Sequence, residues 1–293
     1  MTVSGLPHLY SGKVRELFEV GMDALLMVAS DRISVFDVVL PDLIPDKGRV
    51  LTALSHFWFE RTSDIVSNHV ISCDPTDFPE IAGDVAGRAT LVRAARPIRL
   101  ECVVRGYVFG HGWAEYQETG TVGGFSVPAG LQQAEQLPEP LFTPTTKAET
   151  GHDRSLTAAE AADLVGADVY ERLKDVSLRL YAFGARHAES CGLILADTKF
   201  EFGERDGDVI VIDEMMTPDS SRYWPLEKYR PGTAPPSFDK QYVRDFMDST
   251  GWRHEPPAPP IPAEVIVNTR GKYVEAYEVL TDEAFSDWYG NDD

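Results

Sequence analysis

Charged residues alternate with bulky apolar ones along residues 197–203, which read Asp-Thr-Lys-Phe-Glu-Phe-Gly. Side chains of a strand point to opposite faces with a period of two, so this alternation predicts Lys199 and Glu201 on one face of a strand. Phe200 and Phe202 would pack on the other face. An ammonium group and carboxylates would therefore gather on one surface, above a packed apolar layer.

A second strand-like run, ending in Asp213 and Glu214, follows the first across the hairpin signal Asp206-Gly207. We expect an odd-length loop centred on Gly207, which would place Asp213 opposite Glu201. A two-residue loop would instead shift the pairing by one residue and turn Asp213 to the other face. Two facing carboxylates repel each other unless a cation lies between them, and such oxygen ligands suit magnesium carried by a nucleotide. A solvated acidic hairpin is the alternative interpretation.

A glycine and two cations stand together near the amino end, in the run Tyr10-Ser-Gly-Lys-Val-Arg. Gly12 would let the main chain approach a ligand, and we expect Lys13 and Arg15 to supply positive charge from one face of a strand. The run is not a P-loop, because G-x-x-x-x-G-K-[ST] is absent, and an exposed lysine on an edge strand is the alternative. Phosphoryl transfer needs cations that cradle phosphates and carboxylates that hold the metal, so the two candidate groups complement each other.

The composition excludes several classes of protein. A formal net charge of -20 over 293 residues argues against nucleic-acid binding, which depends on Lys and Arg to neutralise phosphates. One positive island does exist between residues 88 and 105, which suits a small phosphorylated ligand. A strand pair with exposed arginines is the alternative interpretation. No segment approaches the roughly 18 to 20 apolar residues of a membrane span, and no secretion signal is recognised at the start. Three widely spaced cysteines without a CxxC pair fit a reduced, cytoplasmic setting.

Other catalytic motifs are missing from the sequence. It holds neither the HExxH of a zinc hydrolase nor the G-x-S-x-G of an esterase. The dinucleotide fingerprint G-x-G-x-x-G and the H-R-D loop of a protein kinase are also absent. Metal-dependent hydrolysis and the esterase, dinucleotide-binding and protein-kinase classes are therefore not expected.

The spacing of apolar residues predicts an α+β protein of two lobes. Residues 1–95 are expected to form a β-rich lobe that covers a nucleotide, residues 96–262 a larger α+β catalytic lobe, and residues 263–293 a carboxy-terminal helix and tail. The expected strands cover residues 8–20, 24–30, 89–94 and 98–104, with a kink at Pro97 that could expose main-chain groups to a planar ligand. Helices are expected at residues 51–66, 113–118, 168–190, 239–248 and 263–280, and residues 121–150 read as a long irregular segment.

Six separated stretches carry a resemblance to a known family. They are Tyr10-Ser-Gly-Lys-Val-Arg15, Ser30-Asp-Arg-Ile-Ser34, Glu101-Cys-Val-Val-Arg-Gly106, Phe142-Thr-Pro-Thr-Thr-Lys-Ala148, Ala196-Asp-Thr-Lys-Phe-Glu-Phe-Gly203, and Asp213-Glu214 followed by Thr217-Pro-Asp-Ser-Ser-Arg222. In this order, over residues 7–250, they resemble the SAICAR synthetases, the phosphoribosylaminoimidazole-succinocarboxamide synthases. The long segment 121–150 is similar to the longer, yeast-like branch of that family.

The resemblance implies a ligase of de novo purine synthesis that joins L-aspartate to carboxyaminoimidazole ribonucleotide and cleaves ATP to ADP and phosphate with Mg²⁺. It also implies an ATP-grasp-like fold with ATP held between the smaller and the larger lobe, and the length leans toward a monomer. A small-molecule kinase with the same nucleotide site and a nucleotide-binding regulatory protein are the alternatives. Free phosphate released in a complete reaction would distinguish the ligase from both.

The resemblance also assigns roles to individual residues. Gly12, Lys13 and Arg15 match the segment that covers the phosphates, Arg93 belongs to the connector that receives adenine, and Lys199 lies beside the nucleotide. Glu201 and Asp213 match the magnesium ligands. The positions around the ribonucleotide are matched by Arg105, Asp219, Ser221 and Arg222. Weaker matches, near aspartate or a closing loop, are Asp31, Arg32, Ser34 and Lys147. His111 departs from the family pattern, because many relatives have a small hydroxyl residue there.

Overall fold

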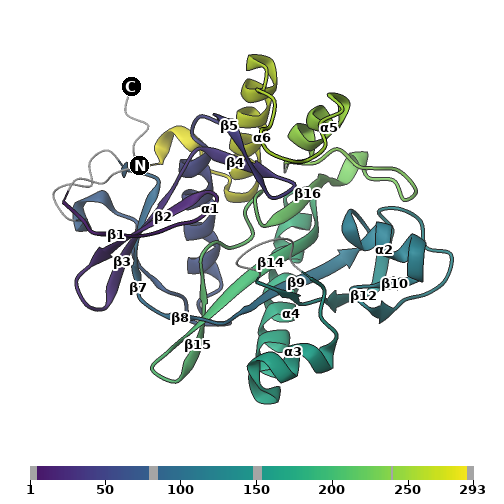
Figure 1. The fold of residues 1–293 in the computed structure, drawn as a ribbon, viewed down its shortest axis with the longest axis horizontal. Coiled ribbons are helices and arrows are strands. Elements are labelled where there is room, and N and C mark those ends of the chain that lie inside the picture. The colour runs from purple at the N-terminus through teal and green to yellow at the C-terminus, as the bar shows by residue number, and fades with distance from the viewer. Residues whose placement is uncertain (1–4, 79–84, 148–153, 239, 289–293) are drawn as a thin grey trace.

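The computed structural model describes residues 5–78, 85–147, 154–238 and 240–288. Two antiparallel sheets dominate this part of the chain, with helices packed around the larger one (Figure 1). The smaller sheet is built from the first hundred residues and the larger from residues 96–225. The α+β class expected from the sequence is confirmed.

The smaller sheet has the strand order β1-β2-β3-β7-β6 in the described residues. Its bounds are β1 His8–Ser11, β2 Arg15–Val20, β3 Ala24–Ala29, β6 Val70–Ser72 and β7 Ala89–Arg93. Phe18, Leu26 and Val28 form its own small apolar cluster. The run expected as one strand over residues 8–20 is instead a hairpin, because Gly12 to Val14 turn between β1 and β2. Lys13 is therefore part of a turn and does not share a strand face with Arg15, as the sequence had suggested.

The larger sheet is centred on β9 and β14, which pair with each other and with the shorter strands around them. Its strands are β8 Arg96–Pro97, β9 Leu100–Tyr107, β12 Gln136–Phe142, β13 Thr145–Thr146, β14 Leu193–Arg205, β15 Asp208–Ile212 and β16 Ser221–Pro225. Residues 121–150, expected to be irregular, contain the seven-residue strand β12 and the small hairpin β10 Thr121–Val122 and β11 Phe125–Ser126. β12 is an edge strand, where proline is tolerated. Because Pro138 and Pro140 are not typical of a strand, the sequence pattern did not reveal it.

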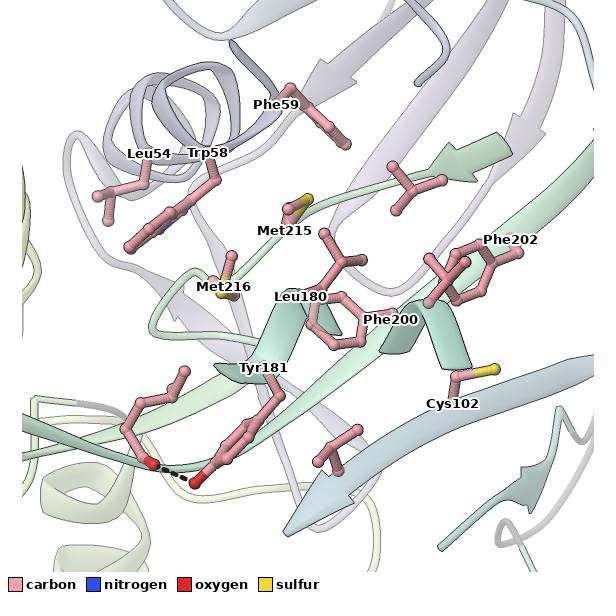
Figure 2. Packing of buried hydrophobic residues seen from close by; sticks show 14 of the residues in the cluster. Leu54, Trp58, Phe59, Cys102, Leu180, Tyr181, Phe200, Phe202, Met215 and Met216 are labelled. Atoms are coloured by element: carbon pink, nitrogen blue, oxygen red, sulfur yellow. Dashed lines mark hydrogen bonds between the residues drawn. The ribbon is translucent and has the colours of Figure 1, made fainter. Parts of the chain in front are cut away.

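The long helix α4, Ala167–Ser190, covers one face of the larger sheet, as its apolar stripe predicts. Figure 2 shows Leu180 of this helix beside Phe200 of β14. Phe200 and Phe202 are both fully buried. Tyr181 donates a hydrogen bond of 2.8 Å to the main-chain oxygen of Leu195. The apolar side of β14 is thus fixed, and its polar residues are held on the opposite face.

Helix α1, Lys47–Arg61, and helix α6, Ala263–Thr281, pack on each other and join the same core. Trp58 of α1, Tyr277 of α6 and Leu100 of β9 belong to one apolar cluster. This core therefore extends across residues 95 and 263, where the sequence predicted boundaries. The remaining helices are α2 His111–Thr119, α3 Ala158–Val165, α5 Gln241–Ser249 and the 3-10 turns Pro75–Asp77, Leu226–Lys228 and Phe285–Asp287. Residue 239, the expected start of α5, lies outside the described residues.

The hairpin between β14 and β15 closes with two residues, so the expectation of an odd-length loop was wrong. Arg205 pairs with Asp208, and Glu201 pairs with Ile212. Asp206 and Gly207 both have positive φ, 54° and 85°, which fits the tight turn that matches the twist of antiparallel strands. Asp213 follows β15 with φ of 66°, so it leaves the ladder and does not obey the alternation of the strand.

A separate hairpin links the smaller sheet to α1. It consists of β4 Arg32–Val35 and β5 Val38–Leu43, joined by Phe36 and Asp37, which both have positive φ. In the ranges that the structure covers, no helix is long and apolar enough to cross a membrane.

Candidate active site

Glu101, Lys199 and Glu201 form a charged cluster on the polar face of the larger sheet. Lys199 Nζ lies 2.6 Å from Glu101 Oε1 and 3.2 Å from Glu201 Oε1. Lys147, in the segment after β13, donates to the other oxygen of Glu201. Burial alone would lower the pKa of Lys199, but Glu201 and Glu101 raise it far above its usual range. Lys199 is therefore a permanent cation. It lies on the same face as Glu201, as the alternation along β14 predicted.

Asp213 and Glu214 lie at the end of β15 and receive Arg15 from the smaller sheet. Arg15 Nη1 is 3.2 Å from Asp213 Oδ1, and Arg15 Nη2 is 2.8 Å from Glu214 Oε2. Burial raises the pKa of Asp213 to about 6, with Arg15 opposing the shift and the negative charges of Glu201 and Glu214 adding to it. Asp213 and Glu201 therefore share one electrostatic environment, although they are not cross-strand partners.

Glu201 differs from Asp213 in its balance of charge. Burial would raise its pKa, but Lys199 and Lys147 lower it to about 2. Glu201 is thus ionised at neutral pH. Burial and the repulsion between carboxylates raise the pKa of the neighbouring Asp213. Across the ranges with assigned structure, no group of three or more His, Cys, Asp and Glu side chains is arranged to hold a metal ion.

Asp197 and two arginines form a second cluster farther along the polar face of β14. Arg105 Nη1 lies 3.1 Å from Asp197 Oδ2, and Arg222 donates to the same oxygen. Arg105 Nε also donates to the Thr143 hydroxyl at 3.0 Å. Burial, opposed by Asp197 and reinforced by Arg222, lowers the pKa of Arg105. Two guanidinium groups on one carboxylate leave an excess positive charge, which suits an anionic ligand.

These arginines line a pocket of about 180 Å³. The amino end of α2 forms part of its wall, where His111 begins the helix and Gly110 precedes it with φ of 56°. A Cβ atom at Gly110 would approach Arg222 Nη2 to 2.9 Å, so glycine lets the loop and the guanidinium lie together. The pocket is lined by Val103, Arg105, His111, Asp197, Thr198, Lys199, Asp219, Ser220, Ser221, Arg222 and Arg244.

Asp219 supports this pocket from a buried network. Its Oδ2 lies 2.7 Å from Lys47 Nζ and 3.2 Å from Lys240 Nζ, and its Oδ1 accepts 2.6 Å from the Tyr273 hydroxyl. Lys47 is fully buried at the start of α1. Ser221, also buried, shares a hydrogen bond of 2.7 Å with the Thr198 hydroxyl. Both predicted residues therefore lie at the pocket, but existing protein contacts hold their polar atoms.

The turn from Gly12 to Val14 lies at the edge of the smaller sheet. The carbonyl of Gly12 accepts a hydrogen bond of 3.1 Å from Arg32 Nη2, and Lys13 Nζ is 2.5 Å from Asp37 Oδ1. Asp31 accepts 2.9 Å from the main-chain nitrogen of Gly48, near the start of α1. Ser34 lies in β4 opposite Val39. The structure thus gives Asp31 and Arg32 contacts within the protein that the sequence did not reveal.

Arg93 is the last residue of β7. Its Nη1 donates 2.7 Å to the main-chain oxygen of Val70. The connector that follows packs against β14, where a Cβ atom at Gly203 would meet the Arg96 oxygen at 3.2 Å. The Arg93 side chain and the main chain of residues 93–97 therefore both remain candidates to meet a ligand.

A family model described as SAICAR synthetase matches residues 8–259 of the chain. The chain belongs to the SAICAR synthetase family. Its relatives include the phosphoribosylaminoimidazole-succinocarboxamide synthase of Desulfosudis oleivorans, 52% identical over 94% of this chain and 96% of the relative. The synthase of Halorhodospira halophila is 48% identical over 95% of this chain and 96% of the relative.

The fold agrees with this membership. SAICAR synthase from Saccharomyces cerevisiae, solved in complex with SAICAR, superimposes with a TM-score of 0.88 at 39% identity, covering 97% of each chain. The two-lobed SAICAR synthase-like fold expected from the six stretches is confirmed. The small-molecule kinase is not favoured, because family and relatives are named as synthases of a carboxamide.

Several residues of the site were not singled out from the sequence. Asp197 stands two and four residues before Lys199 and Glu201, so the same alternation could have found it. Glu101 stands four residues before the predicted Arg105 on β9, a spacing that places both on one face. No periodic signal marks the other residues, which lie in a loop or in the first turn of a helix. They are Glu214, Arg244, Lys47 and Lys240.

Proposed function

We propose that this chain joins L-aspartate to the carboxylate of carboxyaminoimidazole ribonucleotide, forming SAICAR while ATP becomes ADP and phosphate. The observation that carries the proposal is the order of groups along one face of β14. Asp197 belongs to the arginine-lined pocket, and Lys199 and Glu201 follow it at alternate positions. A ribonucleotide held in the pocket would therefore lie beside the charged cluster that receives the terminal phosphate of ATP.

Family membership implies use of a nucleotide, and we propose that Mg²⁺ accompanies it. Glu201 and Asp213 fit this ion, because both offer carboxylate oxygens and their mutual repulsion helps to raise the pKa of Asp213. A cation would relieve that repulsion. Two carboxylates leave positions for phosphate oxygens, which agrees with an ion that arrives on ATP. When bound, the ion would neutralise charge on the β- and γ-phosphates.

The chain's own cations would bind and orient the triphosphate. Gly12, Lys13 and Arg15 would cover the phosphates from the smaller sheet, and the main chain of residues 93–97 would receive adenine. Lys199 would spread positive charge over the transferring phosphoryl group, since Glu101 and Glu201 fix its ammonium. None of these roles needs a side-chain nucleophile.

The reaction would proceed in two displacements. An oxygen of the imidazole carboxylate attacks the γ-phosphorus, and the bond to the β-phosphate oxygen breaks, releasing ADP and leaving an acyl phosphate. The amine of L-aspartate then attacks the acyl carbon, losing a proton as the C–O bond to phosphate breaks. Phosphorylation is required because a free carboxylate is a poor electrophile.

The arginine pocket would grip the ribonucleotide phosphate. Arg105 and Arg222 present planar guanidinium groups that Asp197 holds together, which suits paired hydrogen bonds to a phosphate. His111 would donate a further hydrogen bond where relatives have a hydroxyl residue. Lys147, beside Glu201, is the contact that we propose for the aspartate substrate.

One assay tests the function. ADP, free phosphate and the succinocarboxamide product are measured with ATP, the ribonucleotide and L-aspartate together, and then with each omitted in turn. We expect equal amounts of ADP, phosphate and amide only in the complete mixture. ADP without free phosphate would indicate a kinase, and nucleotide binding without turnover would indicate a regulatory protein.

A further inference from the structure

We propose that the β4–β5 hairpin holds the phosphate-covering turn in place, and that Arg32 and Asp37 are positioning residues of the nucleotide site. The turn is residues 12–14, between β1 and β2. The inference rests on the proposed function, because it treats this turn as a part of the ATP site. Arg32 begins the hairpin and Asp37 stands at its tip, so one element reaches the turn at two points.

Arg32 forms the first contact, to the main chain of the turn. Its Nη2 donates 3.1 Å to the Gly12 carbonyl and lies 2.8 Å from Glu16 Oε1. A carbonyl oxygen held by a guanidinium group cannot rotate toward phosphate oxygens, which would repel it. Arg32 therefore fixes the conformation of the glycine that must approach the ligand.

Glu16 holds the guanidinium group of Arg32 in this position. Its side chain is only 3% exposed and accepts hydrogen bonds of 2.5 Å from the Ser11 hydroxyl and 2.8 Å from His8 Nε2. Burial alone would raise the pKa of Glu16, but these hydrogen bonds and that of Arg32 lower it. Glu16 stays ionised, so the ion pair that orients Arg32 persists at neutral pH. Ser11 and Glu16 are also the last pair of the β1–β2 ladder, so both ends of the turn are tied.

Asp37 forms the second contact, to Lys13. The side chain of Lys13 is 53% exposed and that of Asp37 is 41% exposed, and such exposed pairs add little to stability. The pair instead restricts an ammonium group on a long, flexible stem, which otherwise occupies many positions. Asp37 therefore orders Lys13 before the nucleotide arrives and reduces the entropy that binding must remove.

The tip that carries Asp37 is itself constrained. Phe36 and Asp37 both have positive φ, 50° and 64°, a conformation that residues other than glycine rarely adopt. Phe36 stacks on the ring of His254, with centroids 3.7 Å apart and planes 11° apart. The stack lies outside the smaller sheet and keeps the tip in a backbone conformation that aims Asp37 at Lys13.

The base of the hairpin is anchored in the helices of the larger part of the protein. Ile33 and Val35 of β4 are fully buried with Val243 and Met247 of α5. The smaller sheet has its own apolar cluster, which contains none of these residues. The turn is thus held from outside its own sheet, by an element that rests on the same helix as the pocket residue Arg244.

Binding of a non-hydrolysable ATP analogue, measured by calorimetry with Mg²⁺ present, tests the proposal. The variants are Asp37→Asn, Arg32→Gln, Lys13→Ala and the two double variants with Lys13→Ala. We expect Asp37→Asn to raise the Kd of the analogue about tenfold in the wild-type background and to change nothing in the Lys13→Ala background. Arg32→Gln should raise the Kd about tenfold in both backgrounds, because it acts on the Gly12 carbonyl.

Controls distinguish positioning from damage to the fold. Glu19→Gln removes one exposed negative charge on β2 without touching the turn, and its Kd should equal that of the wild type. Asp37→Asn and Lys13→Ala should bind the succinocarboxamide product within twofold of the wild type, and Arg32→Gln should keep the melting temperature of the wild type. An unchanged or lower Kd for the analogue in Asp37→Asn, or an equal effect of that substitution in both backgrounds, would overturn the role of Asp37. An unchanged Kd in Arg32→Gln would overturn the role of Arg32.

The outcome is separate from that of the proposed function. Wild-type protein that binds the analogue, responds to both substitutions and forms no amide would refute the ligase and retain the positioning roles. Wild-type protein that forms the amide while both substitutions leave the Kd unchanged would retain the ligase and refute the positioning roles. Wild-type protein that binds no analogue would overturn the inference.

Discussion

Arg15 Nη2, on β2 of the smaller sheet, lies 2.8 Å from Glu214 Oε2, in the segment that follows β15 of the larger sheet. The same guanidinium group contacts Asp213 at 3.2 Å, so one cation faces two carboxylates. Burial would lower the pKa of Arg15, but Asp213 and Glu214 raise it above its usual range. Arg15 therefore remains charged and only partly neutralises the two carboxylates that follow β15, and the remaining negative charge suits the cation that we propose.

Asp213→Asn should lower turnover by about 100-fold or more, because loss of one group that stabilises a phosphoryl-transfer transition state costs a few kcal/mol. The fold should remain intact, since burial and neighbouring carboxylates already disfavour the charge of Asp213. Steady-state rates and the melting temperature are the measurements. Asp208→Asn, an exposed change at the start of β15, is the matched control and should keep full activity. Near-normal turnover in Asp213→Asn would contradict the metal-ligand role that we propose for it.

Lys199→Gln should also lower turnover by about 100-fold or more, because it removes the ammonium group that we propose lies beside the transferring phosphoryl. The carboxylates of Glu101 and Glu201 raise the pKa of Lys199 far above its usual range, so wild-type turnover should show no loss at alkaline pH from this lysine. Rates from pH 7 to pH 9 check both statements. Lys174→Gln, on the exposed side of α4, removes the same charge and should be silent. A variant with wild-type turnover would exclude Lys199 from the reaction.

Periodic signals predicted the central part of this site. The alternation along β14 placed Lys199 and Glu201 on a polar face and buried Phe200 and Phe202, as the structure has them. Helix α4 was equally clear because its apolar stripe repeats over many turns. Both predictions depend on regular elements, in which sequence spacing determines the direction of a side chain.

The register of the β14–β15 hairpin was mispredicted because two turn lengths are compatible with Asp206-Gly207. The structure has the two-residue turn, which pairs Glu201 with Ile212. Asp213 still reaches the site, because its positive φ releases it from the strand's alternation. Sequence spacing could not show this, since a left-handed aspartate leaves no periodic trace. The contacts of Lys47 and Arg32 were also missed, because they join segments far apart in the chain.

Arg222→Lys should raise the KM for the ribonucleotide about tenfold with a smaller effect on turnover. Lysine keeps the charge but cannot reproduce the paired hydrogen bonds of a guanidinium group to a phosphate. Initial rates at varied ribonucleotide and varied aspartate concentrations separate the two KM values. Arg179→Lys, on the surface of α4, is the control. An unchanged ribonucleotide KM together with a raised aspartate KM would assign Arg222 to the other substrate.

Asp219→Asn should destabilise the protein by about 3 to 5 kcal/mol, because removal of one partner leaves buried charges uncompensated. Lys47 is fully buried, and Lys240 shares the same carboxylate oxygen. The two lysines lower the pKa of Asp219 against the effect of burial, so it is ionised at neutral pH. Urea denaturation gives the free energy of unfolding. Asp175→Asn breaks an exposed pair with Arg179 and should cost less than about 1 kcal/mol. Equal stabilities of the two variants would show that the buried network contributes nothing.

His69 should make the protein less stable in acid. Burial, with a smaller effect of Arg15, lowers the pKa of His69 to about 3, and its Nε2 has no hydrogen-bond partner within the described part of the chain. In the unfolded state His69 has an ordinary pKa of about 6.5 and binds a proton that it does not bind in the folded state. The free energy of unfolding therefore falls as pH drops from about 6.5 toward 3. From pH 7 to pH 5, the free energy of unfolding of the wild type should fall by about 2 kcal/mol relative to His69→Leu, which cannot titrate at this position. Denaturant titrations of both proteins at the two pH values measure this difference, and a constant difference would mean that His69 is protonated equally in the folded and unfolded states.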